Sequence, residues 1–214
     1  MIKFIDYPDR ESWLSNRNKS IGASEIAFAC GISNFKTVVE LWEEKTGRKK
    51  PNDISFDERV DYGTKAEQYL RELFKLKHKK DFIVNYNPFR VYHNEENPFL
   101  TCTPDGEIIR LSDNAKGLYE CKTVLVNSKT TLDEWKGKIP NVYYCQICQQ
   151  LYCTGFTFAV LNAELRFPDN SAEIREYEIQ RQSAENDIAW LVGKGKEFWR
   201  CVTDNKRPSL SLTL

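Results

Sequence analysis

The segment from Asp57 to about Lys77 constrains the fold most, because it carries a sustained helical pattern. Its apolar side chains recur at steps of four, three, four and three residues, at Tyr62, Ala66, Tyr69, Leu73 and Leu76. This spacing follows the period of an α-helix and predicts one long amphipathic helix with these residues on its apolar face. Such a face must be buried against another layer, so the rest of the chain has to supply a packing surface.

Strand signals follow this helix. Runs rich in β-branched and aromatic residues alternate with Asn-Pro, Asp-Gly and Ser-Asp-Asn turn signals, at residues 82–86, 89–92, 99–103, 106–111 and 118–124. The regular alternation of runs and turns predicts a β-meander.

The first fifty residues are expected to be helical. Residues 9–19 and 37–46 carry helical patterns, and Gly47 stops the second of them. Ser24 is placed to act as the N-cap of a short apolar helix that ends before Gly31.

The C-terminal part alternates helices and strands. A helix is expected at 142–153, strands at 156–165 and 174–179, and a closing helix at about 184–202. The whole order predicts an α/β or α+β fold with a mixed central sheet flanked by helices. We expect one domain over residues 1–214, made of an N-terminal helical part (1–56), a core (57–181) and a C-terminal helix and tail (182–214).

The charge balance limits the kinds of partner. The chain has 31 basic and 31 acidic residues, a formal net charge of zero, so any contact with nucleic acid has to come from a local patch. Apolar runs are far shorter than the roughly 20 residues that a membrane helix needs, and the N-terminus lacks the apolar core of a signal peptide. We therefore expect a cytoplasmic protein that does not span a membrane.

Seven cysteines, an odd number, are scattered through mostly apolar stretches. Reduced, buried thiols are the favoured interpretation. Cys145, Cys148 and Cys153 have a spacing that also occurs in metal sites, but they fall on one predicted helix with no fourth cysteine nearby. Whether these three bind anything is left open.

Two short motifs carry the strongest chemical signal. Thr103-Pro104-Asp105-Gly106 is followed by Glu120-Cys121-Lys122, and both lie at or in predicted strands. Because side chains alternate along a strand, Glu120 and Lys122 project from one face, about 7 Å apart along the strand. Asp105, at the end of a neighbouring strand, can meet them there.

Two carboxylates that converge on one point repel each other unless a cation lies between them. Hard oxygen ligands with an open water shell suit Mg²⁺. A lysine beside the ion can orient or deprotonate an attacking water and stabilise the developing charge on phosphorus. Alone, Pro-Asp-Gly is an ordinary turn and Glu-x-Lys an ordinary solvated strand face. Together and in this order, they favour a site for metal-assisted phosphodiester hydrolysis.

Two helices add polar residues to this hypothesis. Glu67 lies at the margin of the long helix's apolar face, where it points to the packing partner or else extends to solvent. Tyr143, Gln146 and Gln150 form a polar stripe at i, i+3 and i+7 on a largely apolar helix. Such a stripe either satisfies a buried network or orients water or phosphate.

A phosphate pocket is indicated near the N-terminus. Arg17 offers a guanidinium, and the helix start at Gly22-Ala23-Ser24 offers backbone N–H groups that no helical carbonyl accepts. The alternative is simple helix capping.

Five ordered motifs together resemble the lambda exonuclease / YqaJ viral recombinase family of PD-(D/E)xK nucleases. The resemblance covers about residues 10–165 and rests on Arg17 with Ile21-Gly22-Ala23-Ser24-Glu25, Tyr62-Gly63-Thr64-Lys65-Ala66-Glu67, Cys102-Thr103-Pro104-Asp105-Gly106, Leu118-Tyr119-Glu120-Cys121-Lys122 and Tyr143-Tyr144-Cys145-Gln146.

The resemblance implies a restriction-endonuclease-like core and a 5′→3′ exonuclease that acts on double-stranded DNA ends and leaves 3′ overhangs for phage-type recombination. It also implies a role for each of the matching residues. Asp105, Glu120 and the backbone carbonyl of Cys121 would bind Mg²⁺, for which Mn²⁺ can substitute, and Glu67 would serve a second metal. Lys122 would serve the nucleophilic water, Tyr143 and Gln146 would support the site, and Arg17 with Ser24 would bind the DNA 5′-phosphate.

The resemblance also implies a ring-shaped homotrimer around DNA and a single-strand annealing protein as partner. Two other functions remain open: a DNA endonuclease of the same fold, and a non-catalytic DNA-binding module. The second is disfavoured because Asp105, Glu120 and Lys122 are all present, and an inactive copy has no physical reason to keep a repulsive carboxylate pair.

Overall fold

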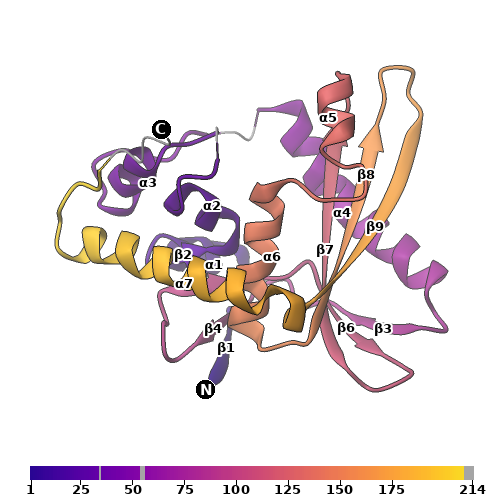
Figure 1. The fold of residues 1–214 in the computed structure, drawn as a ribbon, viewed down its shortest axis with the longest axis horizontal. Helices are drawn as coiled ribbons and strands as arrows, with labels where there is room; N and C mark the ends of the chain where they lie inside the picture. The colour runs from indigo at the N-terminus through magenta and orange to yellow at the C-terminus, as the bar shows by residue number, and fades with distance from the viewer. Residues whose placement is uncertain (34, 54–55, 210–214) are drawn as a thin grey trace.

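The computed structural model describes residues 1–33, 35–53 and 56–209 and has two sheets and a set of helices (Figure 1). The helices are α1 (Arg10–Arg17), the 3₁₀ turn η1 (Ala23–Glu25), α2 (Ile26–Ala29), α3 (Val38–Lys45), α4 (Glu58–Lys77), α5 (Lys129–Asp133), α6 (Asn141–Thr154) and α7 (Arg181–Thr203). The strands are β1 (Ile2–Asp6), β2 (Ile21–Gly22), β3 (Phe82–Asn85), β4 (Arg90–Asn94), β5 (Leu100–Cys102), β6 (Gly106–Arg110), β7 (Lys116–Leu125), β8 (Phe158–Arg166) and β9 (Ala172–Gln180).

The larger sheet has five strands in the order β3-β6-β7-β8-β9 and is mixed. β7 and β8 run parallel, and the other neighbours are antiparallel. The parallel pair is connected through α6, which packs back on the sheet as a crossover helix does. The predicted mixed α/β fold with flanking helices is confirmed.

Helices cover both faces of this sheet. On one face, Leu70 and Phe74 of α4 pack against Ile108, Tyr119 and other side chains of β6, β7 and β8. On the other face, Leu118 and Leu161 pack with α6, which separates the sheet from α2 and α7 (Figure 1). Successive side chains of β7 therefore face different helices.

The pairing of β7 sets up the site. β6 pairs with β7 only from Ile109↔Lys116 to Gly106↔Tyr119, whereas β8 pairs with β7 as far as Leu125. Beyond Tyr119, β7 thus has a strand neighbour on one side only. The Asp105 side chain, from the segment before β6, reaches the backbone of β7 on this open side.

The predicted β-meander is wrong, because β4 and β5 belong to a second sheet in the order β1-β4-β5-β2. β1 pairs with β4 over five residue pairs, and Arg90 on β4 forms an ion pair with Asp6 on β1 at 2.7 Å. The expectation that the first fifty residues are helical is correspondingly wrong at β1 and β2. Neither short strand stands out in the sequence without its partner.

Two further predictions differ from the structure. α4 begins after its N-cap Asp57, as expected, but it buries Leu70, Arg71 and Phe74 and leaves Tyr69, Leu73 and Leu76 exposed. The buried face is therefore rotated from the predicted one: it carries the apolar row Ala66, Leu70 and Phe74 at steps of four, together with Arg71, whose contacts are polar. Ser24 is not an N-cap but lies inside η1, and no side chain caps α2.

No helix in the described part of the chain is long and apolar enough to cross a bilayer.

Candidate active site

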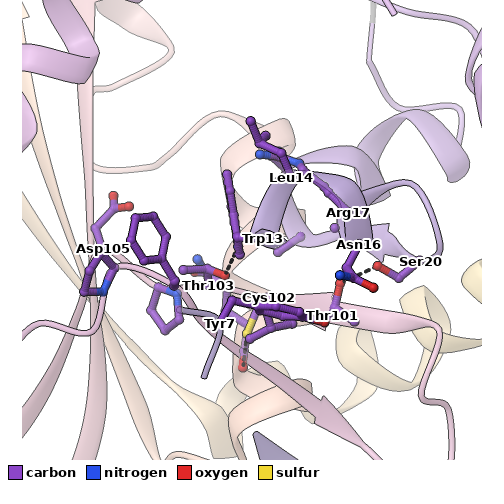
Figure 2. Close-up of a pocket in the computed structure, with 18 of the residues that line it drawn as sticks. Tyr7, Trp13, Leu14, Asn16, Arg17, Ser20, Thr101, Cys102, Thr103 and Asp105 are labelled. Carbon is purple, nitrogen blue, oxygen red and sulfur yellow. Dashed lines mark hydrogen bonds between the residues drawn. The ribbon is translucent and has the colours of Figure 1, made fainter. Parts of the chain in front are cut away.

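A cavity of about 760 Å³ collects most of the predicted site residues. Asp105, Glu120, Lys122, Glu67 and Gln146 line one end of it, and Arg17 and Ser24 line another part. In the view of Figure 2, Trp13 and Thr103 lie between Asp105 and Arg17. Tyr143 lies behind this lining, with Lys122 Nζ 5.7 Å from the centre of its ring.

Asp105 lies directly before the first residue of β6. Its Oδ2 accepts a hydrogen bond of 2.9 Å from the backbone N–H of Cys121. This N–H belongs to the part of β7 that β6 no longer pairs, so the carboxylate replaces a strand partner. This hydrogen bond to the backbone of Cys121 places Asp105 next to Glu120, as the sequence predicts.

Glu120 is the buried carboxylate of the site, with 2% of its surface exposed. Its Oε1 accepts hydrogen bonds from Lys122 and from Gln146, and its Oε2 accepts one of 2.6 Å from Gln150. Glu120 and Lys122 thus project from the same face of β7, as predicted, and the structure shows that this face is turned toward α6. The polar stripe on α6 satisfies this buried carboxylate, so its amides fix the direction of Glu120.

The pKa values of two of these carboxyl groups, Asp105 and Glu67, are raised. Burial and the nearby charge of Glu120 raise the pKa of Asp105 well above its usual range, against the opposing effect of Lys122. Burial also raises the pKa of Glu67, although Arg71 partly offsets it. These are the shifts expected where carboxylates converge without a cation between them.

Lys122 is a stable cation in this setting. Burial by itself disfavours its charge, but Glu120 and Asp105 outweigh that effect and raise the pKa of Lys122 above its usual value. Beside Glu120 and Asp105, Lys122 can donate hydrogen bonds and supply positive charge.

Arg71 of α4 is a residue that the sequence did not single out. Its Nη1 donates to Glu67 Oε1 at 3.2 Å and to the backbone carbonyl of Asp105 at 3.1 Å. One buried guanidinium therefore ties the helix carboxylate to the segment that carries Asp105. Its position one turn after Glu67 is the only sequence signal for it.

The carboxylates fit an open Mg²⁺ site better than a closed one. Among the described residues, no three Asp, Glu, His or Cys side chains already converge closely enough to enclose an ion. Mg²⁺ usually keeps several waters and uses one or two carboxylates together with substrate phosphates. Asp105 and Glu120 offer such oxygen donors, and a cation bound there would offset the negative charge of Glu120 that raises the pKa of Asp105.

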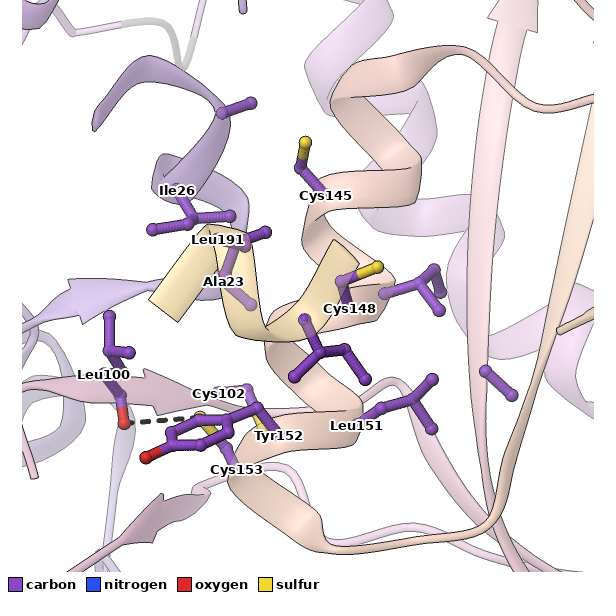
Figure 3. Packing of buried hydrophobic residues seen from close by; sticks show 14 of the residues in the cluster. Ala23, Ile26, Leu100, Cys102, Cys145, Cys148, Leu151, Tyr152, Cys153 and Leu191 are labelled. Carbon is purple, nitrogen blue, oxygen red and sulfur yellow. Dashed lines mark hydrogen bonds between the residues drawn. The ribbon is translucent and has the colours of Figure 1, made fainter. Parts of the chain in front are cut away.

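All seven cysteines are free thiols, and within the described ranges no three Cys, His, Asp or Glu side chains come together around a metal position. Cys145 and Cys148 pack in the core between α6 and its neighbours, and Cys153 donates to the carbonyl of Leu100 (Figure 3). The expectation of reduced, buried thiols is met for these three residues.

The Arg17 end of the cavity is built differently. Arg17 Nη2 donates to Ser24 Oγ at 2.8 Å, and its guanidinium lies 5.2 Å from the centre of the Trp13 ring. Within the described residues, no carboxylate pairs with Arg17. The predicted cluster of N–H groups is reduced, however, because the N–H of Gly22 already donates to Glu25 Oε2 at 2.8 Å.

A buried ion pair lies beneath this end. Lys45 Nζ is 2.7 Å from Glu25 Oε2, and the Lys45 side chain is 1% exposed. Lys45 Nζ also donates to the backbone carbonyl of Arg17 at 3.4 Å. Glu25 therefore connects α3 to the turn that carries Ser24. Neither this link nor Trp13 was predicted, since both depend on tertiary contacts.

Comparisons with known proteins agree with this architecture. An uncharacterized YqaJ protein of Bacillus subtilis (strain 168) is 31% identical over 192 residues, which cover 89% of this chain and 55% of the relative. The chain thus spans about half the length of that curated relative.

Two solved structures have a similar fold. The crystal structure of an alkaline exonuclease (LHK-Exo) from Laribacter hongkongensis matches with a TM-score of 0.66 and 18% identity, over 92% of this chain and 94% of that one. A phage related exonuclease from Haemophilus somnus 129PT matches with a TM-score of 0.59 and 15% identity, over 87% of this chain and 96% of that one.

The model of the YqaJ-like viral recombinase domain matches residues 12–157. This range begins within α1, ends at the residue before β8 and includes every predicted site residue. The chain belongs to the YqaJ-like viral recombinase domain family.

Proposed function

We propose that this protein is a Mg²⁺-dependent exonuclease that degrades double-stranded DNA from its ends in the 5′→3′ direction and leaves 3′ overhangs for phage-type recombination. The observation that carries the proposal is that Asp105, Glu120 and Lys122 share one cavity with Arg17, which has no carboxylate partner among the described residues. Family membership supports it, and the structural relatives are named as exonucleases.

At the carboxylate end, Asp105, Glu120 and the backbone carbonyl of Cys121 would hold Mg²⁺ or Mn²⁺, with Glu67 serving a second ion. A bound metal ion supplies Lewis acidity and a water of lowered pKa. Gln146 and Gln150 keep Glu120 aimed at the cavity through their bonds to its two oxygens. Lys122 carries positive charge for the phosphate oxygens, and the ring of Tyr143 limits where its ammonium group can go.

At the other end, Arg17 and Ser24 would hold the terminal 5′-phosphate. A guanidinium and a hydroxyl form charge-assisted hydrogen bonds with phosphate oxygens. Binding the end of one strand while the adjoining phosphodiester lies at the carboxylates would limit cleavage to DNA ends. This arrangement would give the 5′→3′ direction.

The test compares linear and closed circular duplex of the same sequence. We expect degradation of the linear form only, dependent on Mg²⁺, abolished by EDTA, and faster with 5′-phosphorylated ends. Cleavage of closed circles at a similar rate would instead identify an endonuclease of the same fold. End binding without cleavage in Mg²⁺ or Mn²⁺ would identify a non-catalytic DNA-binding module.

Assembly belongs to the same proposal. A homotrimeric ring would enclose DNA and concentrate positive charge locally, although the net charge of the chain is zero. In the host cytoplasm, a single-strand annealing protein would then bind the 3′ strand that the exonuclease exposes. Light scattering of the purified protein, with and without duplex, would measure the number of subunits directly.

A further inference from the structure

Tyr86 occupies a position beside the carboxylates that the mechanism above does not use. It follows directly after β3, whose last residue, Asn85, pairs with Glu107 of β6. The antiparallel register therefore brings Tyr86 next to Gly106, one residue from Asp105. Tyr86 lines the same cavity as Asp105 and Glu67, and 44% of its surface is exposed.

One face of the Tyr86 ring is already occupied. The guanidinium carbon of Arg71 lies 3.5 Å from the centre of the ring, a cation–π contact. Arg71 is 6% exposed and is held by Glu67 and by the carbonyl of Asp105. The ring is thus fixed relative to the two carboxylate-bearing segments, and its exposed surface faces the cavity.

Tyr69 shows what an ordinary surface tyrosine looks like in this protein. It lies on the outer side of α4, is 68% exposed and has no aromatic or cation–π contact within the described residues. Tyr86 differs from it in two ways. The buried guanidinium of Arg71 packs on one face of the Tyr86 ring, and the ring lies beside the candidate metal site. A ring that is rigid, half-covered and open on the cavity side is suited to stacking.

We propose that the open face of Tyr86 stacks on the nucleobase adjoining the phosphate that lies at Asp105 and Glu120. This inference rests on the proposed nuclease function and adds a base-binding subsite to it. Stacking suits an exonuclease because every base presents a π-face, so the contact tolerates any sequence. Arg71 is the positioning residue of this subsite, because it sets the plane of the ring.

A binding experiment with an abasic nucleotide isolates the stacking contact. Wild-type protein and the variants Tyr86→Ala, Tyr86→Phe and Tyr69→Ala would be titrated with fluorescent linear duplexes, with Ca²⁺ in place of Mg²⁺ so that binding is measured without cleavage. Each duplex carries either a normal or an abasic nucleotide at one of the first two positions from the 5′ end. The quantity compared is the ratio of the two dissociation constants.

We expect the abasic nucleotide to weaken binding by wild-type protein about tenfold at one of these positions, within the range of one base–aromatic stack. Tyr86→Phe and the control Tyr69→Ala keep this ratio, whereas Tyr86→Ala reduces it to about one. Because Tyr86 is half exposed, circular dichroism should show each variant folded.

Retention of the full ratio in Tyr86→Ala would overturn the inference, as would a wild-type ratio of one at both positions. Failure of the wild-type protein to bind any DNA end is a separate result. It would contradict the proposed function itself, whereas end binding without base dependence contradicts only the stacking subsite.

Discussion

The two ends of the cavity are held in place by different means. Glu120 is buried and bonded by Lys122 from its own strand and by Gln146 and Gln150 from α6. Arg17, by contrast, projects from α1, a helix that buries none of its side chains. The carboxylate end is thus fixed before any ligand binds, as catalysis by preorganised charge requires. The Arg17 end has to be positioned by fewer contacts.

These contacts at the Arg17 end converge on Glu25. Its carboxylate accepts from the N–H of Gly22 and pairs with the buried Lys45, which also donates to the carbonyl of Arg17. This difference indicates that the two ends of the cavity have separate functions. Changes at the carboxylate end should alter turnover, and changes at the Arg17 end should alter the choice of DNA terminus.

The largest effect is expected for Lys122→Ala, which removes the cation beside Glu120 and Asp105. We predict a fall in kcat of about 10³-fold, the scale of losing one preorganised electrostatic contact to a transition state. The measurement is single-turnover cleavage of linear duplex in Mg²⁺, with the exposed Lys79→Ala as control. End binding should remain, and unchanged kcat would remove Lys122 from the mechanism.

The next effect is expected for Lys45→Met, which leaves Glu25 without its cation. Removing one partner of a buried ion pair costs about 3 kcal/mol, and the solvent that reaches Glu25 lowers that cost. We predict a lower free energy of unfolding in urea and a loss of preference for 5′-phosphate over 5′-hydroxyl ends.

A double variant Lys45→Met/Glu25→Gln should recover stability, because no unpaired buried charge is left. A phosphate preference equal to wild type in Lys45→Met would show that the ion pair supports the fold alone.

A smaller and more selective effect is expected for Arg17→Ala. The loss of charge-assisted hydrogen bonds to a phosphate, each about 1.5–3 kcal/mol, should reduce the preference for 5′-phosphorylated ends by about 10- to 100-fold. The melting temperature should stay near that of wild type, because α1 buries no side chain. Equal loss on 5′-hydroxyl ends would assign Arg17 to general DNA binding instead.

The smallest effect concerns the stability of the metal-free protein. The pKa of Asp105 is raised on folding, so its contribution to stability is present below its unfolded pKa and is lost as pH rises through the folded pKa. Asp105→Asn should therefore raise the melting temperature of the metal-free protein at neutral pH by about 2–4 °C, the change that 1 kcal/mol produces at this size. The exposed Asp133→Asn serves as control.

The same shift predicts how metal binding depends on pH. Protons compete with Mg²⁺ at Asp105 and Glu67, so the rise in melting temperature on adding Mg²⁺ should grow as pH increases. In Asp105→Asn this rise should be smaller and flatter with pH. A Mg²⁺ effect that is independent of pH would argue against these carboxyls as ligands.

The sequence predicted the carboxylate end well because its signals are local. Alternation along one strand places Glu120 and Lys122 on one face, and both prove to be hydrogen-bonded there. Gln146 and Gln150 are found by helical spacing in the same way. The role of each residue in binding metal stays a prediction.

The rest depended on tertiary contacts that no short pattern carries. Arg71 was not predicted, because its burial depends on Tyr86 and two oxygen partners that only the fold brings together. The sequence pattern places β4 and β5 in one meander, but in the fold β1 pairs with β4 and β2 pairs with β5. Lys45 and Glu25 are far apart in the chain and meet only in the fold.

The most direct test of the division between the two ends is a competition between two linear duplexes that differ only in a 5′-phosphate or 5′-hydroxyl, measured for wild type, Lys122→Ala and Arg17→Ala in Mg²⁺. The account predicts that Lys122→Ala slows both duplexes equally and keeps the wild-type preference, while Arg17→Ala loses the preference and keeps kcat. A loss of phosphate preference in Lys122→Ala, or of kcat on both ends in Arg17→Ala, would contradict it.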